Sequence, residues 1–191
     1  AEKSWNKEIG LRGTYSFIEF EVSGFHISVE DLVAAGRGTA FKNLGKVNNH
    51  GIEFRSSLGI NKVNTLFPNI DVSYSLLDTE VMNGRIISNV PGFVGSEVDI
   101  SGKKLPYAPM HTLMVGVYFT VRNRISIRVD TKYVSEVYTD FENITKMDNL
   151  GIAGPIPEYA VINASASFQV NEKLRMFFSG KNITDESYMG S

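Results

Sequence analysis

The residues that could bind a metal ion are few and widely spaced in this sequence. Its three histidines, His26, His50 and His111, lie on different segments. None has a second histidine or a carboxylate at the spacing that a zinc site requires. Cysteine is absent, which excludes disulfides, thiolate catalysis and cysteine-bound zinc. We therefore expect no metal site and no cofactor, and we expect structural roles for the three histidines.

Residue patterns that mark an enzyme are also missing. The sequence has no G-x-S-x-G turn. An acid pair such as Glu53 and Asp130 can be drawn only by free choice among 21 carboxylates. The glycines around Arg37 lack the strand–helix context and the spacing of a phosphate-binding loop. The sequence therefore predicts a protein that is not an enzyme.

The charges are balanced overall but regularly placed along the chain. The 19 basic and 21 acidic residues give a net charge of -2, so nothing favours nucleic acid as a partner. Locally, Ile125, Ile127 and Val129 alternate with Arg128 and Asp130. Because successive side chains of a strand point to opposite faces, one face here needs water and the other needs hydrocarbon. That hydrocarbon is either a protein core or lipid.

The same alternation recurs along the chain and predicts about eight antiparallel strands. Many of them are about ten residues long, the length that a tilted strand needs to cross a bilayer. Strands of globular proteins are usually about five or six residues long. The predicted strands cover residues 5–15, 18–30, 44–60, 69–82, 109–121, 123–138, 158–170 and 173–184.

The segment 18–30 departs from regular alternation. Phe25, Ile27 and Val29 keep one phase, whereas Phe20 and Val22 keep the other. A β-bulge would produce such a change of phase, and so would a change in which face is buried. The sequence leaves both explanations open.

The connections differ in length in a regular way. Short turns are expected at 16–17, 121–124 and 171–173, and a longer one at 60–68. Between them lie long segments rich in Gly, Asn and Pro, at 31–43, 83–108 and 139–157. Outer-membrane barrels have short periplasmic turns and long extracellular loops. The sequence therefore predicts an all-β, antiparallel transmembrane barrel wall with its long loops outside the cell.

Motifs along the chain point to a particular family. They are E-K-S-W-N-K-E-I-G at 2–10, N-L-G-K with H-G-I-E at 43–53, L-P-Y-A-P-M-H at 105–111 and K-N-I-T-D-E-S-Y at 181–188. In this order they resemble the signatures of TonB-dependent receptors. The stretch 133–140, with 154–159 after it, is most similar to the ferric-citrate type of these receptors.

The resemblance implies the architecture and the cellular role. Residues 1–191 would be part of a barrel of about 22 strands, with neither the plug domain nor the TonB box of the family and without its final strand. The receptor would lie in the outer membrane of a Gram-negative bacterium, in contact with its lipid. It would transport an iron chelate, such as ferric citrate or another siderophore. Import would be driven by the TonB–ExbB–ExbD complex through the plug and the TonB box.

Candidate ligand residues follow from the same resemblance. An anionic chelate requires cationic and hydrogen-bonding groups at the outer mouth. The residues expected there are Arg37, Arg85, Lys103 and Lys104, with Tyr138 and Asp140 beside them. The strand charges Arg55, Arg128, Asp130 and Lys132 are expected to face the lumen as a solvated, mutually paired surface.

Other readings of the strand pattern remain open. One is an independent eight-stranded outer-membrane barrel with an adhesive or structural role, which would need a closing strand with an aromatic end. Another is a soluble carbohydrate-binding β-sandwich. Such a fold would not explain why short turns and long loops alternate along the chain.

Overall fold

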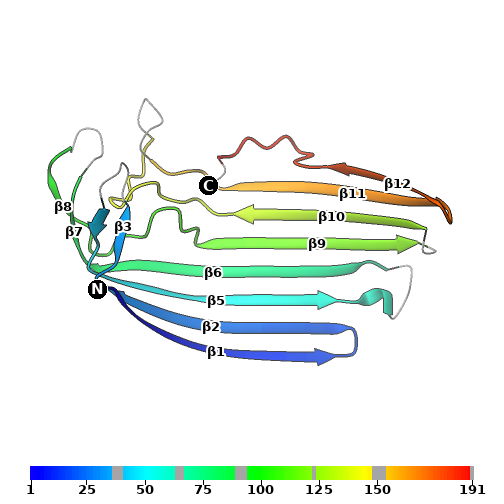
Figure 1. Cartoon of the computed structure of the whole chain (residues 1–191), viewed down its shortest axis with the longest axis horizontal. Helices are drawn as coiled ribbons and strands as arrows, with labels where there is room; N and C mark the ends of the chain where they lie inside the picture. Colours follow the sequence, from blue (N-terminus) through cyan, green and yellow to red (C-terminus); the bar gives the residue numbers. More distant parts are fainter. Residues whose placement is uncertain (36–40, 63–66, 89–93, 122–123, 148–153, 190–191) are drawn as a thin grey trace.

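Eight long antiparallel strands form one sheet in a computed structural model that describes residues 1–35, 41–62, 67–88, 94–121, 124–147 and 154–189. The long strands lie in the sheet in the same order as along the chain, and each pairs with its neighbours (Figure 1). They are β1 (Lys3–Tyr15), β2 (Ile18–Glu30), β5 (Lys46–Leu58), β6 (Asn69–Asn83), β9 (His111–Val121), β10 (Ile125–Val134), β11 (Tyr159–Asn171) and β12 (Leu174–Gly180). All eight predicted strands are thus confirmed, and β1 and β12 are the two edges of the sheet.

The long connections lie at one end of the sheet and the short turns at the other (Figure 1). Two of the long connections contain small hairpins that the sequence analysis did not predict. In one, β3 (Val33–Ala35) pairs with β4 (Phe41–Asn43), and in the other β7 (Arg85–Ile87) pairs with β8 (Glu97–Asp99). A 3₁₀ turn, η1 (Ile60–Lys62), follows β5. The described residues contain no helix long and apolar enough to cross a membrane.

Some predicted strand ends were wrong. The strand predicted from residue 44 begins at Lys46, because Gly45 has a φ of +69°, which is not an extended conformation. The strand predicted to reach residue 138 ends at Val134, and only one bridge, between Val137 and Ile156, lies beyond it. The strand predicted to reach residue 184 ends at Gly180.

The register separates a charged face of the sheet from an apolar one. Arg128 lies opposite Tyr118 and Asp130 lies opposite Gly116, so these side chains share a face that we call the polar face. Ile127 lies opposite Phe119 and Val129 opposite Val117 on the other side, which we call the apolar face. The alternation predicted for this strand is confirmed.

The change of phase in β2 comes from burial and not from a bulge. The pairing of β2 with β1 and with β5 runs without a register shift. Phe25 and Val29 therefore lie on the polar face, at the end nearest the long loops. The ring of Phe25 covers Gly51, where an added Cβ would lie only 2.8 Å from its Cζ atom. Val29 pairs with Val47, which is fully buried. Loops cover the polar face at this end, so apolar side chains are favourable there.

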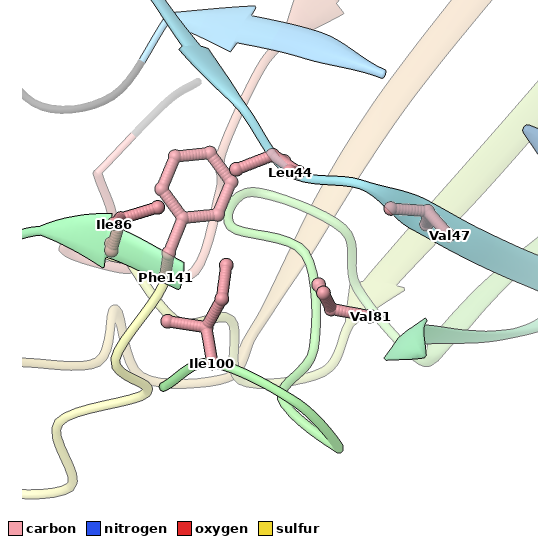
Figure 2. Packing of buried hydrophobic residues seen from close by; sticks show 6 residues of the cluster. All are labelled: Leu44, Val47, Val81, Ile86, Ile100 and Phe141. Carbon is pink, nitrogen blue, oxygen red and sulfur yellow. The ribbon is translucent and has the colours of Figure 1, made fainter. Parts of the chain in front are cut away.

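The most tightly packed part of the described chain lies at the long-loop end. Six buried residues form one hydrophobic cluster (Figure 2). They are Leu44, Val47, Val81, Ile86, Ile100 and Phe141. The loops at this end therefore share a core, which distinguishes them from independent flexible excursions.

Candidate functional site

The long loops form a compact structure at one end of the sheet, which we call the loop platform. In the platform, the ring of Phe141 points toward Leu44, and Ile86 and Ile100 lie near the base of its side chain (Figure 2). Ile86 belongs to β7, Ile100 follows β8, and Leu44 precedes β5. The side chains come from three different connections. The described parts of the platform comprise residues 31–35, 41–45, 84–88, 94–110, 135–147 and 154–158.

Backbone and amide hydrogen bonds join two of these loops directly. The side-chain Oδ1 of Asn143 accepts a hydrogen bond from the amide of Lys104 at 2.6 Å, and its Nδ2 donates to the Lys104 carbonyl at 2.9 Å. The amide of Tyr107 donates to the carbonyl of Tyr138 at 2.9 Å. The loop after β6 and the loop after β10 are thus tied together by polar contacts beside their shared apolar core.

Asp140 stabilises the turn that carries these contacts. Its side chain is only 3% exposed, and its Oδ1 accepts a hydrogen bond from the amide of Ile144 at 3.1 Å. Burial raises the pKa of Asp140, and the nearby Glu142 carboxylate raises it further, while backbone N–H groups, Ile144 first, act in the opposite direction. The geometry gives Asp140 an inward, turn-capping position.

The predicted ligand residues that the structure describes do not form one cluster. Arg85 is exposed on β7 and lies 3.9 Å from Glu97 across its hairpin. Lys103 and Tyr138 are half-buried. The ammonium group of Lys104 lies on the apolar face of the sheet, where it pairs with Asp78. Arg37 lies outside the described residues.

The polar face below the platform forms a broad depression of about 750 Å³. The Arg128 Nη2 atom is 2.8 Å from the Asp130 Oδ1 atom, and the absence of a side chain at Gly116 leaves room beside that pair. Positive and negative groups are interspersed over the surface, so it carries no field of one sign. Its charged lining residues include Arg12, Glu21, Arg55, Asp71, Arg128 and Lys132.

The histidines make structural contacts on the apolar face. His111 Nδ1 lies 2.9 Å from the hydroxyl of Tyr74. His50 Nε2 lies 3.3 Å from Asp78, and the rings of His26 and His50 are 6.2 Å apart. Within the described ranges, no three His, Asp or Glu side chains come together in a way that could hold a metal ion.

Residues that build the platform were missed by the sequence analysis. Asn143 and Phe141 lie in a loop rich in polar residues, and neither belongs to a periodic pattern. The available signal was the presence of large apolar residues, Ile86, Ile100 and Phe141, within segments otherwise typical of solvated loops. Such residues need a common burial site because each contributes about 1.5–3 kcal/mol when fully buried.

Comparison with known proteins places this architecture in a family. A family model described as TonB dependent receptor-like, beta-barrel, matches residues 1–183. The chain belongs to this family. The family assignment identifies the open sheet as part of a receptor barrel. Among curated proteins, no match is found.

Solved structures of TonB-dependent receptors share the fold. The ferric citrate transporter FecA in its unliganded form is 19% identical with a TM-score of 0.77, and the match covers 98% of this chain and 27% of that chain. The siderophore receptor PiuA from Acinetobacter baumannii is 19% identical with a TM-score of 0.74, covering 97% of this chain and 25% of that one. The ferric yersiniabactin uptake receptor FyuA from Yersinia pestis is 18% identical with a TM-score of 0.71, covering 98% and 26%. At these identities the likeness shows the fold, and the chain spans about a quarter of each receptor.

Proposed function

We propose that this chain forms part of the wall and the outer loops of an outer-membrane receptor that imports an iron chelate, with ferric citrate as the first candidate. In this proposal the apolar face of the sheet contacts lipid and the polar face lines the lumen. The long loops lie outside a Gram-negative cell. Import is driven by the TonB–ExbB–ExbD complex acting on a plug domain. Enzymatic chemistry plays no part.

The observation that carries the proposal is the loop platform on a receptor barrel wall. Membership in the TonB-dependent receptor family supports the transport class that we propose. The long loops all lie at one end of the sheet (Figure 1) and share a buried core (Figure 2). A rigid set of loops can hold polar groups in fixed positions and therefore binds a ligand with less loss of conformational entropy. The similar structures include a ferric citrate transporter and a siderophore receptor, which supports an iron chelate as the ligand.

We divide the candidate ligand residues into two groups. Arg37, Arg85 and Lys103, with Tyr138, are proposed to contact the chelate, since its anionic oxygens favour cationic and hydroxyl donors. Lys104 and Asp140 are proposed to act indirectly. The ammonium of Lys104 is paired with Asp78, and Asp140 is buried under the turn at Ile144.

The test is chelate binding by the full-length receptor. The variant carrying both Arg37→Gln and Arg85→Gln is titrated with ferric citrate and compared with the wild type. Each charge-assisted contact in a partly wet loop contributes about 1–3 kcal/mol, so each lost contact should raise the Kd by up to about 100-fold. The control is Arg175→Gln, which neutralises an exposed arginine at the short-turn end of β12.

The outcomes separate the parts of the proposal. A weakened titration for the double variant with unchanged barrel stability supports a direct role of these loops. Unchanged affinity would assign the ligand site to other parts of the receptor and leave this segment as wall alone. Binding of a different chelate in place of ferric citrate would correct the substrate and keep the class.

A further inference from the structure

A row of polar side chains crosses the apolar face of the sheet near the loop platform. It runs over four adjacent strands, β1, β2, β5 and β6, which lie side by side (Figure 1). In register, the row is Lys7, His26, His50 and Asp78. The next row on the same face, toward the short turns, is Ile9, Gly24, Ile52 and Leu76. The polar row therefore borders the apolar surface on the long-loop side.

The charged side chains in this row differ in their ion pairs. Asp78 is paired with the ammonium of Lys104 and with Nε2 of His50. Lys7 is exposed and has neither an ion pair nor a hydrogen bond from its side chain among the residues that the structure describes. His26 is exposed beside it, directly across the β1–β2 pair. An imidazole ring carries an N–H donor in either protonation state. Lys7 and His26 together therefore offer donors to an anion on the outward side of the wall.

An amphipathic cavity of about 630 Å³ starts at this row and extends over the apolar surface. Its polar end is formed by Lys7, His26 and Asp78, and its apolar end includes Ile9 and Leu76. Gly24 lies between Ile9 and Ile52 in the row, and because it has no side chain it leaves a gap between them. A Cβ at Gly24 would meet only the Gly51 carbonyl oxygen, at 3.8 Å. The missing side chain therefore makes a channel one residue wide, directly below His26.

We propose that this cavity binds a phosphate-bearing lipid of the outer leaflet, with the phosphate at Lys7 and His26 and an acyl chain in the channel at Gly24. The inference rests on the proposed function, because it takes the apolar face to be the one in contact with lipid. A basic side chain at the headgroup level attracts anionic lipid. The long stem of Lys7 can extend toward the headgroups while its methylenes cover apolar surface.

The shape of the cavity favours a lipid over a free anion. A free phosphate would need donors on several sides, whereas the donors here lie at one end of a mainly apolar surface. The iron chelate is expected at the polar face or the loop tips, on the other side of the sheet from Lys7 and His26. A lipid is the ligand class whose anionic group and hydrocarbon match both ends of the cavity.

The experiment measures lipid binding to the full-length receptor in detergent by native mass spectrometry. Dioleoyl phosphatidylglycerol and dioleoyl phosphatidylcholine are titrated separately, since they share acyl chains and differ in headgroup charge. We expect tighter binding of phosphatidylglycerol. Lys7→Gln should weaken it about fivefold, the effect of one basic residue near an anionic headgroup, and adding His26→Gln should remove the remaining headgroup preference. Lys173→Gln, at the short turn before β12, is the matched control and should change nothing.

A second variant tests the apolar half. Gly24→Leu places a side chain in the channel, its Cβ would meet only the Gly51 carbonyl oxygen at 3.8 Å, and it should weaken both lipids alike. The same variants should bind ferric citrate with the affinity of the wild type. A negative result for lipid binding would therefore leave the proposed function unaffected. Equal binding of the two lipids by the wild type would overturn the proposal. So would a headgroup preference that survives Lys7→Gln with His26→Gln, or displacement of phosphatidylglycerol by millimolar inorganic phosphate.

Discussion

Gly45 lies at the point where the loop platform meets β5. Its φ is +69°, and an added Cβ would lie 2.1 Å from the backbone carbonyl oxygen of Asn83. Backbone cannot move aside as a side-chain end can. We therefore expect Gly45→Ala to destabilise the platform by about 2 kcal/mol or more, from left-handed strain and the clash together. Hydrogen–deuterium exchange over residues 41–47 of the full-length receptor measures the effect.

Gly95 provides the matched control for that substitution. Its φ is +84°, but nothing lies within 4 Å of an added Cβ. Gly95→Ala should therefore show only the conformational strain, about 1 kcal/mol. Equal exchange in the two variants would contradict the role assigned to the Asn83 carbonyl.

Asp140 gives the platform a dependence on pH. Burial raises the pKa of Asp140 above its usual value of 3.8. A carboxyl group with a raised pKa in the folded state stabilises that state at pH values below the unfolded pKa, and the contribution is lost as pH rises through the folded pKa. Exchange protection of residues 139–147 should therefore fall as pH rises from 3 toward neutrality. Asp140→Asn, which keeps an acceptor for the Ile144 amide but cannot ionise, should remove this dependence.

At the residue scale, the sequence indicates which loop residues could contact a ligand but not where their side chains lie. Lys104 and Arg85 both appeared as loop cations, because nothing in a sequence separates a cation paired with Asp78 from one at a loop tip. Asp140 appeared as a polar loop residue, although it is buried. The burial of Phe141 next to it could not be predicted, because burial in a loop depends on which distant segments meet.

At the scale of the strands, prediction succeeded because the alternation is local. Each strand needs only its own residues to show a period of two, so all eight were found. The hairpins β3–β4 and β7–β8 were not, because strands of three residues are too short to show a period. In β2 the alternation changes phase near Phe25, whose ring covers Gly51 on the polar face. The sequence could show the change but not its cause.

The assignment of the apolar face to lipid can be tested by one substitution. Val129 lies near the middle of β10 and is 37% exposed on the apolar face. Val129→Lys should destabilise the receptor in lipid by roughly 2–4 kcal/mol if it lies at mid-bilayer. Ser75→Lys, on the polar face opposite Glu53, is the control and should be tolerated. Reversed results, measured by denaturant unfolding in vesicles, would exchange the lumen and lipid faces.

At the scale of the whole molecule, the end with the platform should lie outside the cell. This chain has no cysteine, so a single cysteine introduced into it can report exposure once any cysteine elsewhere in the receptor has been replaced. In intact cells, a membrane-impermeant maleimide should label Ser101→Cys in the platform and leave Lys173→Cys at the short turn unlabelled. Labelling of the second site without permeabilisation would invert the topology.

The shared core of the platform has a consequence for how these loops can be exchanged between receptors. Ile86, Ile100 and Phe141 come from two connections, and Leu44 from a third. A graft that replaces one connection alone would leave its former partners with uncovered apolar side chains. Chimaeras that carry 31–45, 83–110 and 135–158 together should therefore express and insert better than any single graft. The unit of recombination for a new ligand preference in this part of the receptor is thus the trio of loops.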